Sequence, residues 1–123
     1  MNQFLLVFIG GGLGSVIRFL VATVVNNKLK TEFPLATFTS NILSCLILAG
    51  LTYLITEKNI YNQELKLFLI IGLCGGLSTF STFSFETLVL LKNQNYGYAL
   101  ANISISIFTC LGLMYYILKK SPY

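Results

Sequence analysis

Apolar residues fill four long stretches of the chain, and short polar segments separate them. The stretches cover residues 4–25, 35–55, 67–91 and 97–118, and each contains at most one charged side chain. A helix needs about 20 residues to cross the roughly 30 Å of hydrocarbon in a bilayer, and every stretch is long enough. We therefore predict an all-α membrane protein with four transmembrane helices in a single domain, residues 1–123.

Composition supports this interpretation and excludes other classes. Only 10% of the 123 residues are charged, whereas a soluble domain has about a quarter, so we expect no extramembrane catalytic domain. The basic side chains are scattered between the apolar stretches and form no patch, so nucleic acid is not an expected partner. The first stretch lacks the basic start and the cleavage site of a secretory signal, and we expect it to remain in the mature protein.

Cysteine spacing indicates neither a disulfide framework nor a zinc site. The three cysteines lie in three different stretches and include no closely spaced pair: Cys45, Cys74 and Cys110. Because zinc ligands and disulfide frameworks usually show paired spacings, we interpret these cysteines as packing residues.

The lysines are divided almost evenly between the two sides of the predicted bundle. Four lie on the side of the two chain ends and three on the opposite side: Lys58, Lys66, Lys119 and Lys120, against Lys28, Lys30 and Lys92. Orientation in a membrane follows the lysine and arginine bias of short loops, so this near balance leaves two interpretations open. Either details other than charge fix one orientation, or the protein inserts in both and pairs antiparallel with itself.

The first stretch combines a glycine run with one arginine. Gly10 and Gly14 are four residues apart and share a helix face, which lets another backbone approach closely. The run lacks the neighbouring strand and lysine of a phosphate-binding loop. Arg18 costs about 2.5–3.5 kcal/mol at the centre of an isolated membrane helix. It either extends toward the membrane surface as an anchor or faces a hydrated vestibule, where it concentrates anions.

Asn41 is the largest polar side chain of the second stretch. A buried amide without a partner costs roughly a few kcal/mol, so Asn41 either links two helices by hydrogen bonds or lies beside a permeating anion. In the second case its NH₂ group replaces water around the ion without adding a fixed positive charge.

The third stretch contains paired glycines followed by five hydroxyl side chains. Gly75 and Gly76 each cost about 1 kcal/mol relative to alanine in a helix interior, so we predict that the third helix is broken there in mid-membrane. Broken backbone at that depth is tolerated only where protein or a water-filled cavity covers it. Its freed carbonyl groups can hold a small cation, as unwound segments do in transporters.

Two phenylalanines follow the predicted break. Phe80 and Phe83 are three residues apart on one helix face, and the hydroxyls of Ser81 and Thr82 flank them. The pair is either core packing or, since phenyl rings have positive edges, part of an environment for a small hydrated anion. Stripping such an ion of water costs roughly tens of kcal/mol in an apolar medium. Glu86, the single carboxylate in any stretch, either supports this region by hydrogen bonds or serves the pathway.

The segment GLCGGLSTFSTFS at residues 72–84 closely resembles the signature of the CrcB/Fluc family of fluoride channels. The glycine-rich run before Arg18 and the pair Thr37 and Asn41 match further marks of this family, and the resemblance extends over all four stretches. The second stretch departs from the family pattern at three positions, which we interpret as changes in helix packing: Ala36, Ser40 and Ser44.

The resemblance implies an antiparallel, dual-topology homodimer with two pores, which would explain the lysine balance. Phe80 and Phe83 match the phenylalanines whose ring edges contact fluoride. Asn41 matches the pore-lining amide, while Ser81 and Thr82 match a polar track along the pore.

The resemblance also implies a structural sodium ion at the dimer interface. Backbone carbonyls at the positions of Gly75 and Ser78 would hold it, and Arg18 matches the vestibule arginine of the family. In the fourth stretch the match is diffuse, and spacing alone indicates three further pore-lining or supporting residues: Asn102, Ser106 and Thr109.

Together these features predict a fluoride-selective channel that passively exports fluoride down its electrochemical gradient and so lowers fluoride toxicity in the cytoplasm. We expect a multi-pass protein of the prokaryotic plasma membrane, embedded in lipid, and not an enzyme. Three other classes fit less well. A small multidrug exporter needs a carboxylate in the first stretch, where only Arg18 is charged; an intramembrane enzyme would lack a histidine or aspartate base; and a pure assembly protein leaves Asn41 unexplained.

Overall fold

All four apolar stretches form helices in the computed structural model, which describes residues 2–58 and 62–121. None of these residues forms a strand, and the helical elements follow one another in this order: α1 (Gln3–Lys28), α2 (Leu35–Glu57), α3 (Gln63–Lys66), η1 (Leu67–Cys74), α4 (Gly75–Leu77), α5 (Phe80–Lys92) and α6 (Tyr96–Leu118). Four segments, namely α1, α2, α3 to α5 together, and α6, are long and apolar enough to cross a membrane. The predicted all-helical class with four long apolar helices is confirmed.

Polar residues beside the apolar stretches set where helices begin. Asn2 Oδ1 accepts a hydrogen bond from Phe4 N (3.0 Å) at the start of α1, and Asn62 Oδ1 accepts one from Leu65 N (3.1 Å) at the start of α3. These side chains satisfy donors that the first turn of a helix leaves without an internal partner. Pro34, whose ring carries no N–H, directly precedes α2.

The third segment changes conformation along its length. The π-helix η1 leads into α4, then Ser78 (φ −79°, ψ 156°) and Thr79 (φ −152°, ψ 114°) are extended, and α5 begins at Phe80. Our prediction of a break at Gly75 and Gly76 is therefore wrong in position, because both glycines are helical. Residues 78 and 79, called the junction below, are where helical conformation stops and resumes.

Glycines allow α1 to lie directly against η1 and α4. A Cβ added to Gly14 would lie 2.8 Å from the Leu77 backbone nitrogen, and one added to Gly72 would lie 2.9 Å from Gly10 Cα. A Cβ at Gly76 would likewise clash with the backbone of α1. This confirms that the glycine face of α1 serves close helix packing, and it gives Gly76 a role other than breaking the helix.

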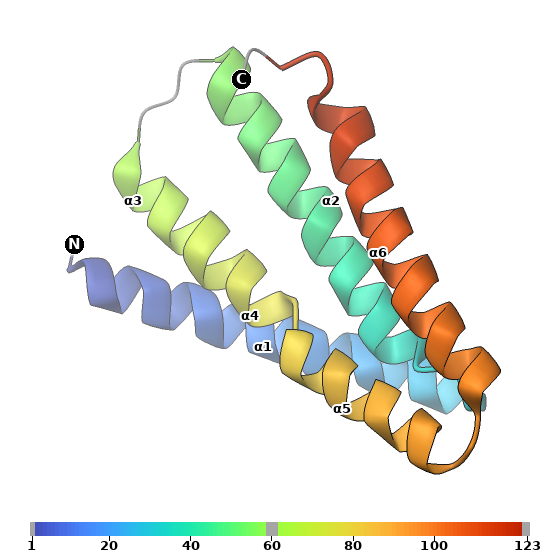
Figure 1. Ribbon diagram of the computed structural model, residues 1–123. Helices are drawn as coiled ribbons and strands as arrows, with labels where there is room; N and C mark the ends of the chain where they lie inside the picture. The colour runs from blue at the N-terminus through green and yellow to red at the C-terminus, as the bar shows by residue number, and fades with distance from the viewer. Residues whose placement is uncertain (1, 59–61, 122–123) are drawn as a thin grey trace.

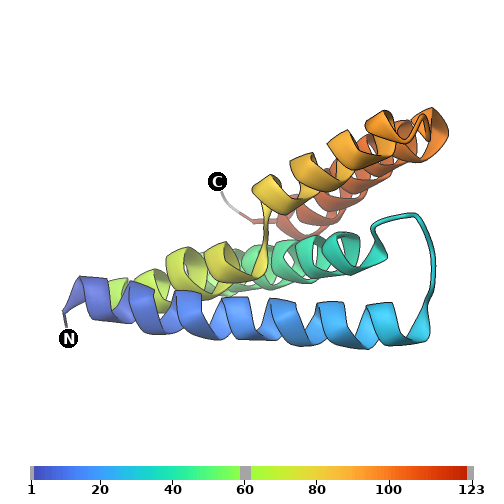
Figure 2. The same cartoon turned by 90° about the horizontal axis from the view of Figure 1, so that it is seen from below.

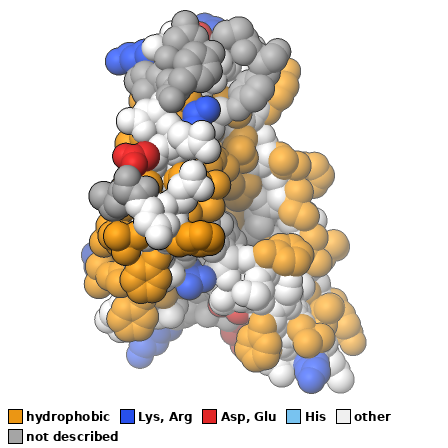
Figure 3. All heavy atoms as spheres, turned by 90° about the vertical axis from the view of Figure 1, so that its left-hand side faces the viewer, with side chains coloured by type: hydrophobic (Ala, Val, Ile, Leu, Met, Phe, Trp, Pro, Cys, Tyr) orange, Lys and Arg blue, Asp and Glu red, His pale blue; other side chains and the backbone are white. Residues whose placement is uncertain are grey.

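The helices form two pairs that meet at the junction. In Figure 1, α1 lies beside η1 and α4, and α2 lies beside α6. Figure 2 shows that α5 turns away from the layer containing α1 and packs with α6. Apolar side chains spread over much of the face in Figure 3, and large ones such as Phe4, Phe80 and Phe108 are 85%, 80% and 76% exposed. An apolar surface of this extent needs a cover of lipid or protein.

Candidate functional site

One amide on α2 holds the junction. Thr79 N donates to Asn41 Oδ1 (2.8 Å), and Asn41 Nδ2 donates to Thr79 O (3.5 Å). In an unbroken helix the Thr79 N–H would bond to the carbonyl of Gly75, four residues earlier, so the Asn41 side chain replaces that partner. Asn41 thus links two helices, as one of its two interpretations requires, and its NH₂ group has a second hydrogen to donate.

Thr79 is the N-cap residue of α5. Thr82 N donates to Thr79 Oγ1 (3.2 Å), and Thr79 Oγ1 donates to Thr82 Oγ1 (3.0 Å). Ser81 Oγ lies 3.4 Å from the same oxygen, and Ser81 and Thr82 are both exposed. We did not predict Thr79 as a site residue. Threonine is nevertheless a preferred residue at the start of a helix, where its hydroxyl accepts a hydrogen bond from the backbone N–H two or three residues later.

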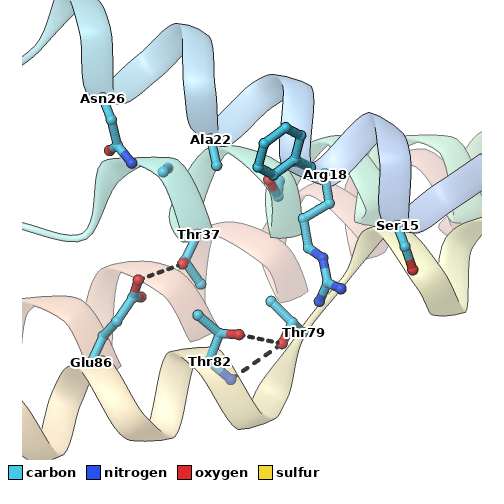
Figure 4. Close-up of a pocket in the computed structure, with 11 residues that line it drawn as sticks. Ser15, Arg18, Ala22, Asn26, Thr37, Thr79, Thr82 and Glu86 are labelled. Carbon is cyan, nitrogen blue, oxygen red and sulfur yellow. Dashed lines mark hydrogen bonds between the residues drawn. The ribbon is translucent and has the colours of Figure 1, made fainter.

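A first cavity, of about 270 Å³, lies between α1, α2 and the start of α5. Arg18, Thr82 and Glu86 are among its lining residues, and Figure 4 shows the Arg18 guanidinium extending from α1 toward the junction. Thr37 Oγ1 donates to Glu86 Oε1 (2.9 Å). Glu86 Oε2 is buried and has no hydrogen-bond partner among the described residues. The structure therefore places Arg18 at a cavity and gives Glu86 a hydroxyl partner.

A second cavity, of about 410 Å³, lies on the other side of the junction, between α2, α5 and α6. Asn41, Phe80 and Phe83 line it, and the two phenyl centroids are 6.0 Å apart with the ring planes tilted by 34°. Phe80 is 80% exposed, and Phe83 is half-buried. Thr79 lines both cavities, so the junction is the wall between them.

Polar residues of α6 are linked to the backbone of Phe83 through hydrogen bonds. Asn102, which is 1% exposed, donates through Nδ2 to Thr87 Oγ1 (2.9 Å), and Thr87 Oγ1 donates to the carbonyl of Phe83 (2.7 Å). Ser106 Oγ donates to Asn102 Oδ1 (3.4 Å) and also lines the second cavity. Thr109 is half-buried and lines neither cavity.

Two serines of α2 that depart from the family pattern have different surroundings. Ser44 Oγ donates to the carbonyl of Cys74 (2.9 Å), which ties α2 to the end of η1. Ser40 is fully buried, lines the first cavity, and its hydroxyl has no partner among the described residues. Ser44 therefore acts in helix packing, whereas Ser40 leaves a free hydroxyl at the cavity.

Two backbone carbonyls, those of Gly75 before the junction and Ser78 within it, are candidate ligands for a small hard cation. The Gly75 carbonyl lacks the Thr79 N–H that a continuous helix would provide, and the space beside Gly75 is open. Ser78 is extended directly after the end of α4. Carbonyls of unwound backbone and at the C-terminal ends of interrupted helices coordinate sodium in transporters. Among the described residues, no cluster of three histidine, cysteine or acidic side chains offers another metal site.

A protein-family model described as CrcB-like protein, Camphor Resistance (CrcB), matches residues 5–117. The chain belongs to the CrcB family. The match includes the junction and both cavities, and it confirms the family resemblance of the sequence.

Individual relatives extend the CrcB assignment over nearly the whole chain. A protein named fluoride-specific ion channel FluC from Flavobacterium psychrophilum is 44% identical over 114 residues, which cover 93% of this chain and 90% of the relative. The proteins of the same name from Phocaeicola vulgatus and Gloeothece citriformis are 49% identical over 96 residues and 38% identical over 125 residues. These alignments cover 78% of both chains for P. vulgatus, and 98% of this chain and 99% of the relative for G. citriformis. With four helices long enough to span a bilayer, this member of the CrcB family is a multi-pass membrane protein.

Proposed function

We propose that the protein is a fluoride-selective channel that lets fluoride leave the cytoplasm passively. The observation that carries the proposal is the junction, where the Asn41 amide, several hydroxyls and two phenyl rings meet between two cavities. Relatives named fluoride-specific ion channels that align over almost the full chain support it. Their bacterial origin supports a location in a prokaryotic plasma membrane. Conduction down an electrochemical gradient needs no reaction, so the protein acts as a channel and not as an enzyme.

Neutral donors replace the water around the ion. Fluoride loses its hydration shell at a cost of roughly tens of kcal/mol in an apolar medium, so contacts must be dense along the path. The second N–H of Asn41, the exposed hydroxyls of Ser81 and Thr82, and the positive ring edges of Phe80 and Phe83 provide them. None of these groups carries a fixed positive charge, so the ion is stabilised without being trapped.

Arg18 acts at the entrance and not along the path. Its guanidinium borders the first cavity, where a positive charge raises the local concentration of anions. Glu86 lies in the same cavity with one carboxylate oxygen bonded to Thr37, and we assign it a supporting role that fixes α5 against α2.

A second copy of the chain completes each pathway. Phe80 borders the second cavity yet is 80% exposed in a single chain, so one chain cannot surround an ion at this position. An antiparallel homodimer covers such a face, presents two equivalent pores, and agrees with the four-to-three division of lysines. Lipid covers the remaining apolar surface.

Sodium fits the junction as a structural ion at the dimer interface. The carbonyls of Gly75 and Ser78 would hold it, and it would supply a positive charge that keeps these oxygen atoms together. Because backbone ligands cannot be removed by substitution, the test is exchange of the buffer cation. Prolonged replacement of sodium by a bulky organic cation should lower fluoride efflux, and restoring sodium should recover it; unchanged efflux would contradict the site.

Fluoride selectivity is tested in liposomes containing the purified protein. Vesicles loaded with fluoride should empty far faster than vesicles loaded with chloride. Phe80→Ile and Phe83→Ile should slow fluoride efflux because both remove a ring edge from the second cavity. Phe4→Ile is the matched control, since Phe4 is 85% exposed and lines neither cavity. Equal release of the two anions, or no release, would refute the proposed function.

A further inference from the structure

Three sulfur-containing side chains line the second cavity, and conduction of fluoride gives them no role. Cys45 lies on α2, and Cys110 and Met114 lie on α6. Cys110 and Met114 are four residues apart and share a helix face, and α2 packs along α6. Sulfur-containing residues from two helices therefore line one cavity of about 410 Å³.

The two thiols are free and border the same cavity. Cys45 and Cys110 are both half-buried and form no disulfide, and they line the same cavity from the two packed helices α2 and α6. Cys74 differs from them, because it is buried and does not line the cavity. We interpreted all three cysteines as packing residues from the sequence, since spacing along the chain does not reveal a pair formed by two helices.

Sulfur donors select the kind of ion. Thiolate and thioether groups prefer soft cations such as Cu⁺, whereas hard cations take oxygen ligands. A monovalent cation suits this cavity because it can displace one thiol proton to the solvent, which leaves the total charge of the site unchanged. An added charge in so apolar a setting would be costly.

We propose that Cys45, Cys110 and Met114 form a binding site for a monovalent soft cation of the Cu⁺ and Ag⁺ class. The bound ion joins α2 to α6 beside Phe80 and Phe83, which line the same cavity. A further consequence of ion binding rests on the proposed channel function: a bound ion narrows the fluoride pathway and slows fluoride efflux.

Silver binding is measured on the purified protein without any transport assay. In chloride-free, thiol-free buffer, titration with silver nitrate should reach one tightly bound ion per chain. The double variant Cys45→Ser/Cys110→Ser should lose at least about tenfold in affinity, equivalent to about 1.4 kcal/mol, while the matched control Cys74→Ala should bind as the wild type does. Loss of binding in the control alone, or equal binding by all three proteins, would overturn the site.

A protection experiment tests the same site in the wild type, so it does not depend on the variants folding. Silver should shield Cys45 and Cys110 from alkylation by N-ethylmaleimide, as read by mass spectrometry of the derived peptides. Shielding of neither thiol would overturn the proposal.

The transport consequence is tested in fluoride-loaded liposomes, each protein being compared with itself with and without silver. Silver should slow efflux through the wild type and Cys74→Ala at least about tenfold more than through the double variant. Bound silver that leaves efflux unchanged would refute the effect on the pathway while leaving the binding site intact. Absence of fluoride efflux before silver is added would instead count against the channel function, and the binding titration would still decide the site.

Discussion

At the scale of single residues, Asn41 shows how one side chain can take over the hydrogen bonds of a helix. Its two amide atoms face the backbone N–H and carbonyl of Thr79. Sequence reasoning singles out Asn41 because a large amide in an apolar stretch needs a partner. The identity of that partner is not predictable in the same way, because the Thr79 backbone is free only as a result of where α4 ends.

Asn41→Ala should lower both stability and fluoride efflux. The substitution leaves the Thr79 N–H, in a residue that is 7% exposed, without an acceptor, and an unsatisfied buried donor costs about 1–3 kcal/mol. Stability is measured by denaturant unfolding in detergent with circular dichroism, and efflux in liposomes. Asn27→Ala, at an exposed position near the end of α1, is the matched control. A variant as stable as the control would show that the amide does not hold the junction.

Other residues show where prediction from sequence stops. Five hydroxyls follow Leu77 in close succession, and spacing alone does not tell that Thr79 is the helix cap while Ser81 and Thr82 remain exposed. The hydrogen-bond partner of Ser44 is equally hidden from a local pattern, because the Cys74 carbonyl is 30 residues away in sequence. Such assignments depend on tertiary contacts that a local pattern does not encode.

At the scale of elements, the sequence predicted an interruption of the third helix but placed it a few residues too early. Glycine weakens a helix, which directed the predicted break to Gly75 and Gly76, yet both remain helical and the junction follows at residues 78 and 79. Tertiary packing outweighs local propensity here, because Gly72 and Gly76 lie against the backbone of α1. The π-helix η1 had no sequence signal that we recognised.

Gly76→Ala should destabilise the protein by separating α4 from α1. The added methyl group would clash with the backbone of Gly11, and overpacking of this kind costs about 1–3 kcal/mol. Unfolding in detergent, followed by circular dichroism, gives the measurement.

Gly112→Ala is the matched control for that experiment. It lies on α6 with nothing within 4 Å of the added methyl group, so the gain of about 1 kcal/mol in helix propensity should leave stability unchanged or raised. Equal effects of the two substitutions would refute the close-packing role of Gly76.

At the scale of the whole molecule, hydropathy alone predicts four spanning helices and the structure agrees. It does not predict which helices become neighbours. The pairing of α1 with η1 and α4 depends on matching glycine faces. Polar contacts link α2 and α6 each to the third segment, through pairs such as Ser44 with Cys74 and Asn102 with Thr87. Both kinds of contact require distant parts of the sequence to be considered together.

Dual topology is testable through lysines at opposite ends of the bundle. Lys92 ends α5 just before α6 begins, and Lys119 follows the end of α6, so a membrane-spanning α6 places the two lysines on opposite sides of the bilayer. If the protein inserts in both orientations, a membrane-impermeant amine reagent should modify both residues in sealed spheroplasts, each to about half the extent seen after permeabilisation. Modification of only one of the two, read by peptide mass spectrometry, would establish a single orientation.

The glycine contact between α1 and the third segment also sets an order of events during synthesis. Chains are made from the N-terminus at about 5–20 residues per second, so α1 is complete before its counterpart at residues 67–77 exists. During that interval the Gly10 and Gly14 face lacks the backbone against which it packs in the folded protein. The first helix therefore reaches its final surroundings only after more than half of the chain has been translated, and a delay between the second and third helices prolongs the time that it spends without its partner.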